Sequence, residues 1–188
     1  MTTLILASQS PQRRSILEQL GVAFEVVVPD VEELSDGPPH ELAIENACRK
    51  AAAVAERRPG ETVLGVDTIV ALGTRLFGKP ADRQEARTCL RALAGRTHGV
   101  ISGVCLIEPD RRRMAAASTA VRFRAFADAE LEWYLDSEEW RGRAGGYAIQ
   151  GRGAALVSGI EGDYLNVVGL PVPTLLDLIP DLLGTAGS

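Results

Sequence analysis

The sequence predicts an α/β protein in which one set of strands is flanked by helices. Short apolar runs typical of buried strands alternate along the chain with longer segments whose apolar residues recur at helical spacing. The chain has 188 residues, and no repeat, low-complexity tract or linker divides it. We therefore expect residues 1–188 to form a single domain, with a loose tail over residues 185–188.

The predicted strands are apolar runs bounded by glycine, proline or polar residues. Gly73 and Thr74 can turn one strand back into a short hairpin, and the polar segment 108–113 can join two others. The strands are expected at residues 4–7, 24–28, 63–72, 76–77, 100–107, 116–123, 147–150 and 154–157.

The predicted helices carry apolar residues three and four positions apart. Ser10 stands at the N-cap of the first helix with Pro11 in its first turn, and Gly21 ends it. The helices are expected at residues 11–20, 40–58, 83–94 and 128–136. Residues 171–183 are expected to form an amphipathic helix or a pair of turns.

Composition and charge exclude several classes of protein. The net charge of −5 argues against general binding to nucleic acid, which depends on basic contacts to phosphates. The start of the chain lacks the pattern of a signal peptide, and no apolar run approaches the ~20 residues of a membrane span. Three scattered cysteines indicate a reduced, cytoplasmic protein, and two histidines make a histidine-based zinc site improbable.

The first candidate site lies between the first strand and the first helix. Ser8 and Ser10 offer hydroxyl groups at a helix start, where free N–H groups and the helix dipole favour a phosphate. Arg13 or Arg14 adds a forked cation. The alternative is an ordinary capping serine followed by solvated arginines.

The second candidate is Asp67, which interrupts the apolar run 63–70. A carboxylate buried there needs a metal ion, a cation or hydrogen-bond donors to offset its desolvation. Asp67 is therefore a candidate metal ligand or general base. The alternative is an aspartate at a strand bend that backbone N–H groups satisfy.

Further charged residues could complete a phosphate site. Glu32 and Glu33 belong to the acidic loop 29–39, and carboxylates without histidines suit Mg²⁺ or Mn²⁺. Lys50 and Lys79 could contact phosphates, although most such lysines and acidic loops are simply solvated.

The last candidate site comprises two glycine-rich segments, 143–151 and 162–171. Gln150 carries a donor and an acceptor, so it can pair with a base edge that presents a C=O beside an N–H. The alternative is a pair of tight turns that flank a hairpin.

Taken together and in this order, the segments resemble the Maf family, septum-formation-type proteins understood as nucleotide pyrophosphatases. The matching motifs extend over nearly the whole chain. They are residues 7–11 with Arg13, Glu33, residues 50–51, 65–68, 78–80 and 93–95 with His98, and both glycine-rich segments.

The resemblance implies an elongated α/β fold with a mixed sheet and a cleft between two lobes, similar to the inosine triphosphate pyrophosphatases. It implies a homodimer and makes the residue at Asp67 the proton acceptor. Glu33 aligns with an acidic site residue of the family. The family's phosphate-site residues align with Ser8, Ser10, Arg13, Lys50 and Lys79.

One family branch carries the motif Gly-x-Tyr-x-Ile-Gln and resembles dTTP/UTP pyrophosphatases. Residues 145–150 match this motif, and Thr68 also fits the branch. Gln12 departs from it, because the usual motif has arginine there. Arg143 replaces a lysine and Ser102 a threonine.

We expect metal-dependent hydrolysis of nucleoside triphosphates to monophosphate and pyrophosphate. The expected substrates are dTTP, UTP and modified pyrimidine nucleotides, with Gln12, Gln150 and Thr68 among the binding residues. Glu33 and Asp67 would hold Mg²⁺ or Mn²⁺. The alternatives are an inosine- or xanthosine-type pyrophosphatase and a non-catalytic nucleotide-binding regulator of cell division.

Overall fold

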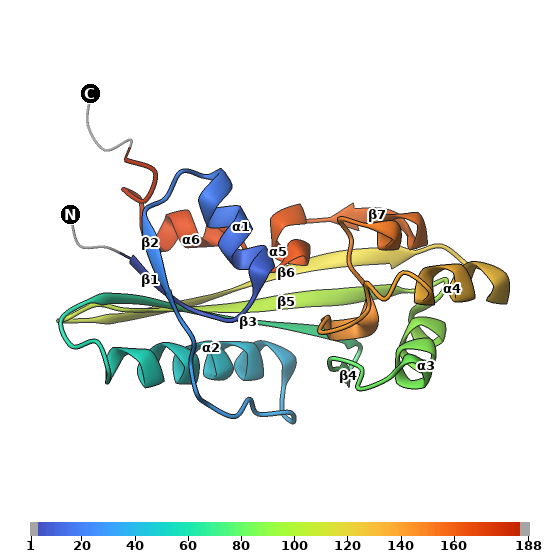
Figure 1. Ribbon diagram of the computed structural model, residues 1–188, viewed down its shortest axis with the longest axis horizontal. Helices are drawn as coiled ribbons and strands as arrows, with labels where there is room; N and C mark the ends of the chain where they lie inside the picture. Colours follow the sequence, from blue (N-terminus) through green and yellow to red (C-terminus); the bar gives the residue numbers. More distant parts are fainter. Residues whose placement is uncertain (1–3, 185–188) are drawn as a thin grey trace.

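A seven-stranded mixed sheet runs through the elongated molecule in the computed structural model, which describes residues 4–184 (Figure 1). The strand order is β2-β1-β3-β5-β6-β7, and β4 pairs with β3 outside this path. The strands are β1 (Leu4–Ala7), β2 (Phe24–Val27), β3 (Thr62–Leu72), β4 (Arg75–Phe77), β5 (Thr97–Ile107), β6 (Arg112–Phe123) and β7 (Val157–Glu161).

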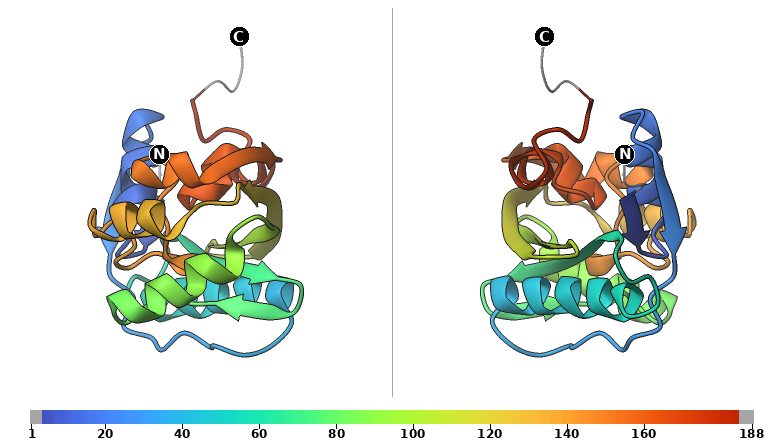
Figure 2. Two further views of the ribbon diagram at one scale, coloured as in Figure 1. Left: turned by 90° about the vertical axis from the view of Figure 1, so that its right-hand side faces the viewer. Right: turned by 90° about the vertical axis from the view of Figure 1, so that its left-hand side faces the viewer.

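Helices cover both faces of this sheet. The helix α2 lies along one face, whereas α1, α5 and α6 lie on the other, and α3 and α4 gather at one end of the molecule (Figures 1 and 2). The α-helices are α1 (Pro11–Gln19), α2 (Pro39–Ala55), α3 (Arg83–Leu93), α4 (Asp128–Leu135), α5 (Tyr164–Val168) and α6 (Val172–Leu178). The two short 3₁₀ helices are η1 (Ala144–Gly146) and η2 (Arg152–Leu156).

The strand register brings the end of β1 next to the middle of β3. These strands are parallel, and Ala7 pairs with Gly65. The chain leaves β1 immediately before Ser8, so the turn into α1 lies near Asp67 two residues further along β3. The antiparallel neighbour β5 places Ser102 opposite Thr68. The sheet therefore brings the first two candidate sites side by side.

Two glycines allow α2 to lie unusually close to the sheet. A Cβ atom on Gly65 would come within 2.1 Å of the Ala47 carbonyl oxygen, and one on Gly103 within 2.2 Å of the Ala43 carbonyl oxygen. Real Cβ atoms do not tolerate such distances to helix backbone, so only glycine fits at these positions. Small residues of α2, Ala47 and Ala51 among them, pack here in a core separate from the main one.

Most predicted helices and strands are confirmed, with ends that differ by a few residues. The helix α2 ends at Ala55 instead of residue 58, and α6 occupies only the first part of the segment 171–183, followed by turns. The strand β5 begins at Thr97 instead of residue 100, and β6 begins at Arg112 instead of residue 116. The tail expected at residues 185–188 lies outside the described residues.

The strands predicted at residues 147–150 and 154–157 are wrong. Residues 147–150 form an extended stretch and a turn, η2 follows, and β7 begins only at Val157. The Glu139 carboxylate accepts the N–H groups of Arg152 (2.9 Å) and Gly153 (3.2 Å), so these donors have no need of a strand partner. The second glycine-rich segment contains α5, whose N-cap is Asp163.

No helix in the described part of the chain is both long and apolar enough to span a membrane.

Candidate functional site

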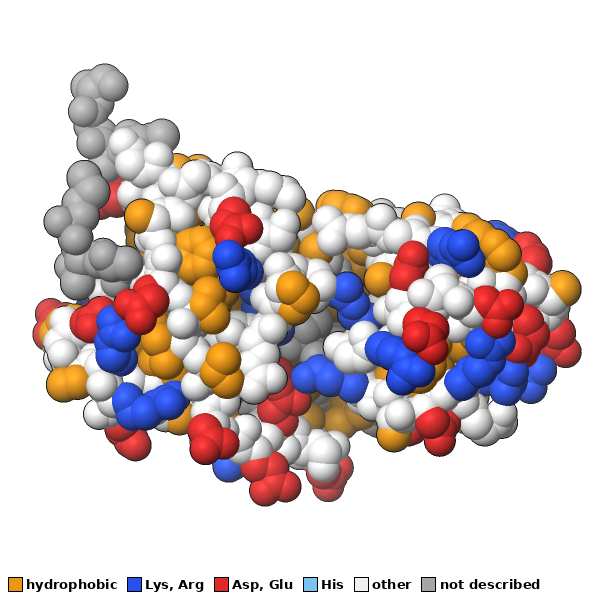
Figure 3. Space-filling model, viewed as in Figure 1, with side chains coloured by type: hydrophobic (Ala, Val, Ile, Leu, Met, Phe, Trp, Pro, Cys, Tyr) orange, Lys and Arg blue, Asp and Glu red, His pale blue; other side chains and the backbone are white. Residues whose placement is uncertain are grey.

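A cleft of about 690 Å³ is lined by the start of α1, the loop before α2, the middle of β3 and the two glycine-rich segments. Figure 3 shows a hollow near the middle of this face, with basic side chains beside it. Ten of the residues that the sequence suggested for binding, catalysis or a metal line this cleft, whereas Arg14 and Glu32 do not. The ten residues are Ser8, Ser10, Gln12, Arg13, Glu33, Lys50, Asp67, Thr68, Lys79 and Gln150.

The start of α1 forms one wall of the cleft. Ser10 is the N-cap, and its Oγ accepts the Arg13 N–H at 3.4 Å, while Ser8 Oγ accepts the Ser10 N–H at 3.1 Å. Gln12 lies in the same turn, where its Oε1 accepts the Ser10 hydroxyl at 3.2 Å. The first serine is buried and the second half-buried, which fits a rigid helix start at the base of the cleft.

Arg13 connects this turn to two other segments. Its Nε donates to the Gly169 carbonyl oxygen (2.9 Å), and its Nη atoms donate to Ser8 Oγ (3.2 Å) and Thr68 Oγ1 (3.1 Å). Burial lowers the pKa of Arg13, while the charges of Asp67 and Glu33 oppose this shift. An arginine stays protonated under all such conditions, so Arg13 is a fixed positive charge within the cleft.

Two carboxylates and two ammonium groups form the charged centre of the cleft. Lys50 Nζ lies 2.6 Å from Asp67 Oδ1 and 2.5 Å from Glu33 Oε1, and Lys79 Nζ lies 3.5 Å from Glu33 Oε2. Lys50 and Asp67 are buried, whereas Glu33 and Lys79 are accessible. Burial alone would raise the pKa of Glu33, but Lys50 and Lys79 outweigh it and the net pKa is lowered. Glu33 thus stays ionised at neutral pH.

Asn46 is a site residue that the sequence patterns do not reveal. It lies one helical turn before Lys50 on α2, it is buried, and its Nδ2 donates to Asp67 Oδ2 at 3.2 Å. The available signal is a polar side chain on the apolar face of an alanine-rich helix, four residues from a lysine. Asp67 therefore has a partner on each oxygen, and the alternative of satisfaction by backbone N–H groups is not what the structure shows.

The other end of the cleft is mostly apolar. Val70, Val100, Val168 and Ile149 line it, and Gln150 is exposed at its rim. The Tyr147 hydroxyl lies 2.8 Å from His98 Nε2, inside the core. This end offers apolar contact and one amide, which suit a nucleobase.

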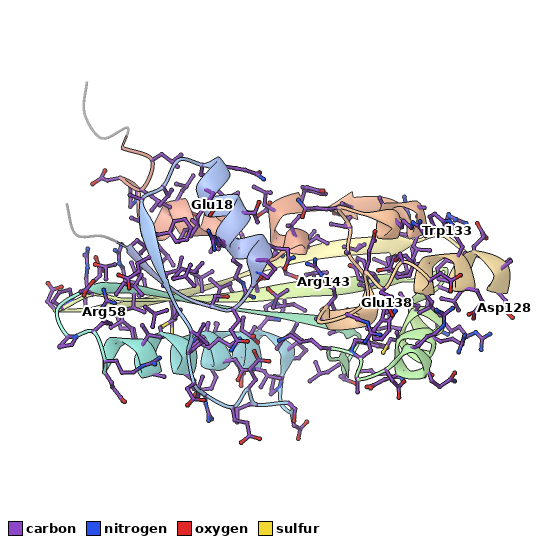
Figure 4. All side chains as sticks on the ribbon, in the orientation of Figure 1. Glu18, Arg58, Asp128, Trp133, Glu138 and Arg143 are labelled. Atoms are coloured by element: carbon purple, nitrogen blue, oxygen red, sulfur yellow. The ribbon has the colours of Figure 1, made fainter. Side chains whose placement is uncertain are left out.

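Arg143 contributes a further positive charge to the cleft. Figure 4 places it near the middle of the molecule, whereas Arg58 and Asp128 lie toward opposite ends. It is half-buried, and burial lowers its pKa. Its position in the lining supports a role for the first glycine-rich segment beyond that of a turn.

The carboxylates of the cleft could hold a hard divalent cation, but only with help from a ligand. No cluster of three or more histidine, cysteine or acidic side chains suited to a metal ion occurs within residues 4–184. Glu33 and Asp67 both contact Lys50 Nζ, so their oxygens face a common point. Mg²⁺ commonly takes one or two carboxylates and completes its shell with phosphate oxygens and water. The donor set fits a cation that binds together with a polyphosphate.

Comparison with known proteins identifies the family. The family described as Maf-like protein matches residues 3–182. The chain belongs to the Maf family. Three relatives named dTTP/UTP pyrophosphatase come from Symbiobacterium thermophilum (45% identity, 100% of both chains), Pyrococcus furiosus (44%, 95% of both) and Gloeobacter violaceus (46%, 95% of both). The mixed sheet with flanking helices agrees with the fold expected for Maf proteins.

Proposed function

We propose that this Maf protein hydrolyses dTTP and UTP to the nucleoside monophosphate and pyrophosphate. The observation that carries the proposal is the buried Asp67 carboxylate, which lies in one cleft with the cations Arg13, Lys50 and Lys79. Relatives that match along nearly the full chain bear the corresponding name. A simple binding protein would have no need of a buried carboxylate held so close to a phosphate site.

The cationic end of the cleft receives the triphosphate. Ser8 and Ser10 stand at the start of α1, where the helix dipole and free N–H groups favour an anion. Arg13, Lys50 and Lys79 place three positive charges along the path of the phosphates. These groups stabilise the charge that accumulates on the pyrophosphate as it leaves, so positioning and electrostatics supply most of the rate increase.

Asp67 is the proposed general base. Lys50 and Asn46 contact its two oxygens and hold the carboxylate in one orientation. A water molecule beside Asp67 would attack the α-phosphorus, and its proton would pass to the carboxylate. The substrate phosphates would draw Lys50 and Lys79 away from Glu33, which frees carboxylate oxygens at the moment of binding.

Glu33 and Asp67 would hold Mg²⁺ or Mn²⁺ together with the triphosphate. When bound, the metal supplies positive charge against the phosphates and increases the acidity of a bound water. The accessible Glu33 leaves room for such an exchange, since its present partners are two lysine ammonium groups that the phosphates can also bind.

The apolar end of the cleft receives the pyrimidine. Gln150 has the donor and acceptor needed to pair with the adjacent C=O and N–H groups of thymine or uracil. Thr68 lies between the two ends, although its hydroxyl contacts Arg13 and Ser102 in the structure. Its contribution to base selection would therefore be shared with the anchoring of Arg13.

We further propose that the chain acts as a single domain and a homodimer in the cytoplasm, without nucleic-acid or membrane partners. One sheet contains strands from Leu4 to Glu161, which supports the single domain. Sedimentation velocity at several protein concentrations tests the dimer, and a constant monomer mass would contradict it.

A substrate panel tests the function. The protein is incubated with Mg²⁺ and dTTP, UTP, CTP, 5-methyl-UTP, ITP or 7-methyl-GTP, and pyrophosphate release is measured. We expect dTTP, UTP and the methylated uridine nucleotide to give the highest kcat/KM. A preference for ITP would support the inosine-type alternative, and binding without hydrolysis would support the regulator.

A further inference from the structure

The buried amide of Asn46 connects the two carboxylates of the cleft. Its Nδ2 donates to Asp67 Oδ2 (3.2 Å) and to the Leu34 carbonyl oxygen (2.9 Å), and its Oδ1 accepts the Leu34 N–H (2.8 Å). Leu34 directly follows Glu33 in the acidic loop. One side chain of α2 thus touches both the proposed base and the segment that carries the other carboxylate.

The backbone N–H and C=O groups of Leu34 fix the orientation of the Asn46 side-chain amide. If the amide were reversed, its NH₂ group would face the Leu34 N–H and its oxygen would face the Leu34 carbonyl. The observed orientation directs Nδ2, a donor, at Asp67 Oδ2. An acidic residue here would repel the carboxylate, and an apolar residue would leave a buried oxygen without this donor.

The same amide is the main anchor of the acidic loop. Within the described residues, the only hydrogen bonds made by the backbone of residues 29–37 are the two between Leu34 and Asn46. The Leu34 side chain is exposed, with 41% of its surface accessible, so side-chain packing does little to hold this part of the loop. The position of Glu33 relative to Asp67 therefore depends on Asn46 and on the lysine ammonium groups.

We infer that Asn46 is a positioning residue for hydrolysis, because it holds the Asp67 carboxylate and the Glu33 loop in one fixed relation. The inference rests on the function proposed above and adds a residue to it. Asn46 acts through Asp67 and the Glu33 loop and contacts no substrate atom in this account. Its effect is to keep the base oriented and Glu33 within reach when the lysines turn to the phosphates.

Two variants and one control separate the roles of this amide. Asn46→Ala removes both the loop anchor and the donor to Asp67. Asn46→Asp keeps an acceptor for the Leu34 N–H but replaces the donor by a charge that repels Asp67. Leu34→Ala is the control, because the bonds to Asn46 use only the backbone of that residue.

Steady-state kinetics with dTTP and Mg²⁺ provide the first measurement. We expect kcat to fall about tenfold or more in Asn46→Ala, the lower range for losing a hydrogen bond to a charged group. The KM should change less, because Arg13 and Lys79 remain in place. Asn46→Asp should lose at least as much kcat as Asn46→Ala, and Leu34→Ala should keep the wild-type value.

Amide hydrogen exchange of the free protein, followed by NMR, provides the second measurement. The Leu34 amide should be protected in the wild type, despite its exposed loop, and in Leu34→Ala at the same position. Its protection should fall about tenfold or more in Asn46→Ala and be retained better in Asn46→Asp. Unchanged exchange in the strands of the sheet shows that the variants are folded.

The two measurements together decide the inference. Wild-type kcat in Asn46→Ala, or a loss confined to KM, would overturn the positioning role. An unprotected Leu34 amide in the wild type would overturn the anchor. If the wild-type protein hydrolyses none of the nucleotides, the proposed function fails and the positioning role with it, while Leu34 exchange still shows whether Asn46 holds the loop.

Discussion

The charged centre of the cleft is formed by charged residues that lie in otherwise apolar elements. Asp67 is an acid in an apolar strand, and Lys50 is a buried cation on a helix rich in alanine. Each would be costly to bury alone, and their 2.6 Å contact offsets part of that cost. This pair shows how the fold accommodates a carboxylate inside the sheet.

Replacing Asp67 by asparagine tests the proposed base. Asparagine keeps the shape and an acceptor for Lys50, but it cannot take up a proton from water. We expect kcat for dTTP to fall by at least ~10²-fold, the low end for general-base catalysis. Circular dichroism should show an unchanged fold, and a variant with most of its activity would remove Asp67 from the mechanism.

Gln12 is the residue most open to improvement by substitution. It lines the cleft at the start of α1, and its only polar partner in the described residues is the Ser10 hydroxyl. Gln12→Arg adds a cation near the phosphates, so the KM for dTTP or UTP should fall. The binding free energy gained should be at most ~1.5–3 kcal/mol, the contribution of one hydrogen bond to a charged group. Unchanged KM and substrate ranking would make the position neutral. A raised KM would mean that the Gln12–Ser10 contact itself is needed.

At the residue scale, sequence patterns predict the residues whose type is unusual for their own segment. They miss the residues whose role depends on a contact with a distant segment. Asp67, Arg13 and Gln150 attract notice within their own segments, and all three line the cleft. Asn46 and Glu139 act on residues at least 12 positions away, through the contacts with Leu34 and with Arg152. Only the fold brings those partners together.

The element that positions the site is α2, together with the two strands beneath it. Lys50 and Asn46 project from this helix toward Asp67, and their reach depends on how closely the helix approaches the sheet. Gly65 and Gly103 set that approach, because a Cβ atom on either would collide with the helix backbone.

Gly103→Ala should therefore weaken both the fold and the activity. The added methyl group would lie 2.2 Å from the Ala43 carbonyl oxygen, so α2 must shift away from the sheet. We expect a loss of about 1–3 kcal/mol in the free energy of unfolding, typical of overpacking, with a lower kcat. Gly78→Ala is the control, since nothing lies within 4 Å of its added Cβ. Equal urea unfolding curves for both variants would contradict this account of the helix position.

Local sequence signals predict most helices and strands, because the residues that begin or end an element lie within a few positions of it in the sequence. Ser10 and Pro11 begin α1, and Asp82 caps α3 through the Glu85 N–H. The strand prediction for residues 147–157 is wrong because backbone N–H groups of this region donate to Glu139, a residue outside the segment. Apolar periodicity cannot detect such a contact, so it predicts strands where the chain makes turns.

At the scale of the whole molecule, His98 links stability to pH. It is buried beside Tyr147 and Phe123, its Nδ1 has no hydrogen-bond partner within residues 4–184, and burial lowers its pKa from 6.5 to about 4. Between these two values the unfolded chain binds a proton that the folded chain does not. The contribution of the neutral His98 to stability is thus fully present above pH 6.5 and is lost as the pH falls toward 4.

Urea unfolding at pH 7 and pH 5 measures this effect. His98 should account for about 2 kcal/mol of the stability lost between the two values, from 1.36 kcal/mol per pKa unit. His98→Leu removes the titrating group, so the variant should lose less stability than the wild type over the same interval, whatever its stability at pH 7. An equal loss in both proteins would assign the pH dependence to other groups.

The most direct test of the central claim follows the oxygen of the attacking water. In the proposed function, cationic and apolar residues of one cleft would orient the triphosphate with its α-phosphorus near Asp67. Hydrolysis of dTTP in ¹⁸O-labelled water with Mg²⁺ should give dTMP and pyrophosphate, with the label in dTMP, and should stop when the metal is chelated. Products of dTDP and orthophosphate, or a label in the pyrophosphate, would contradict attack at the α-phosphorus.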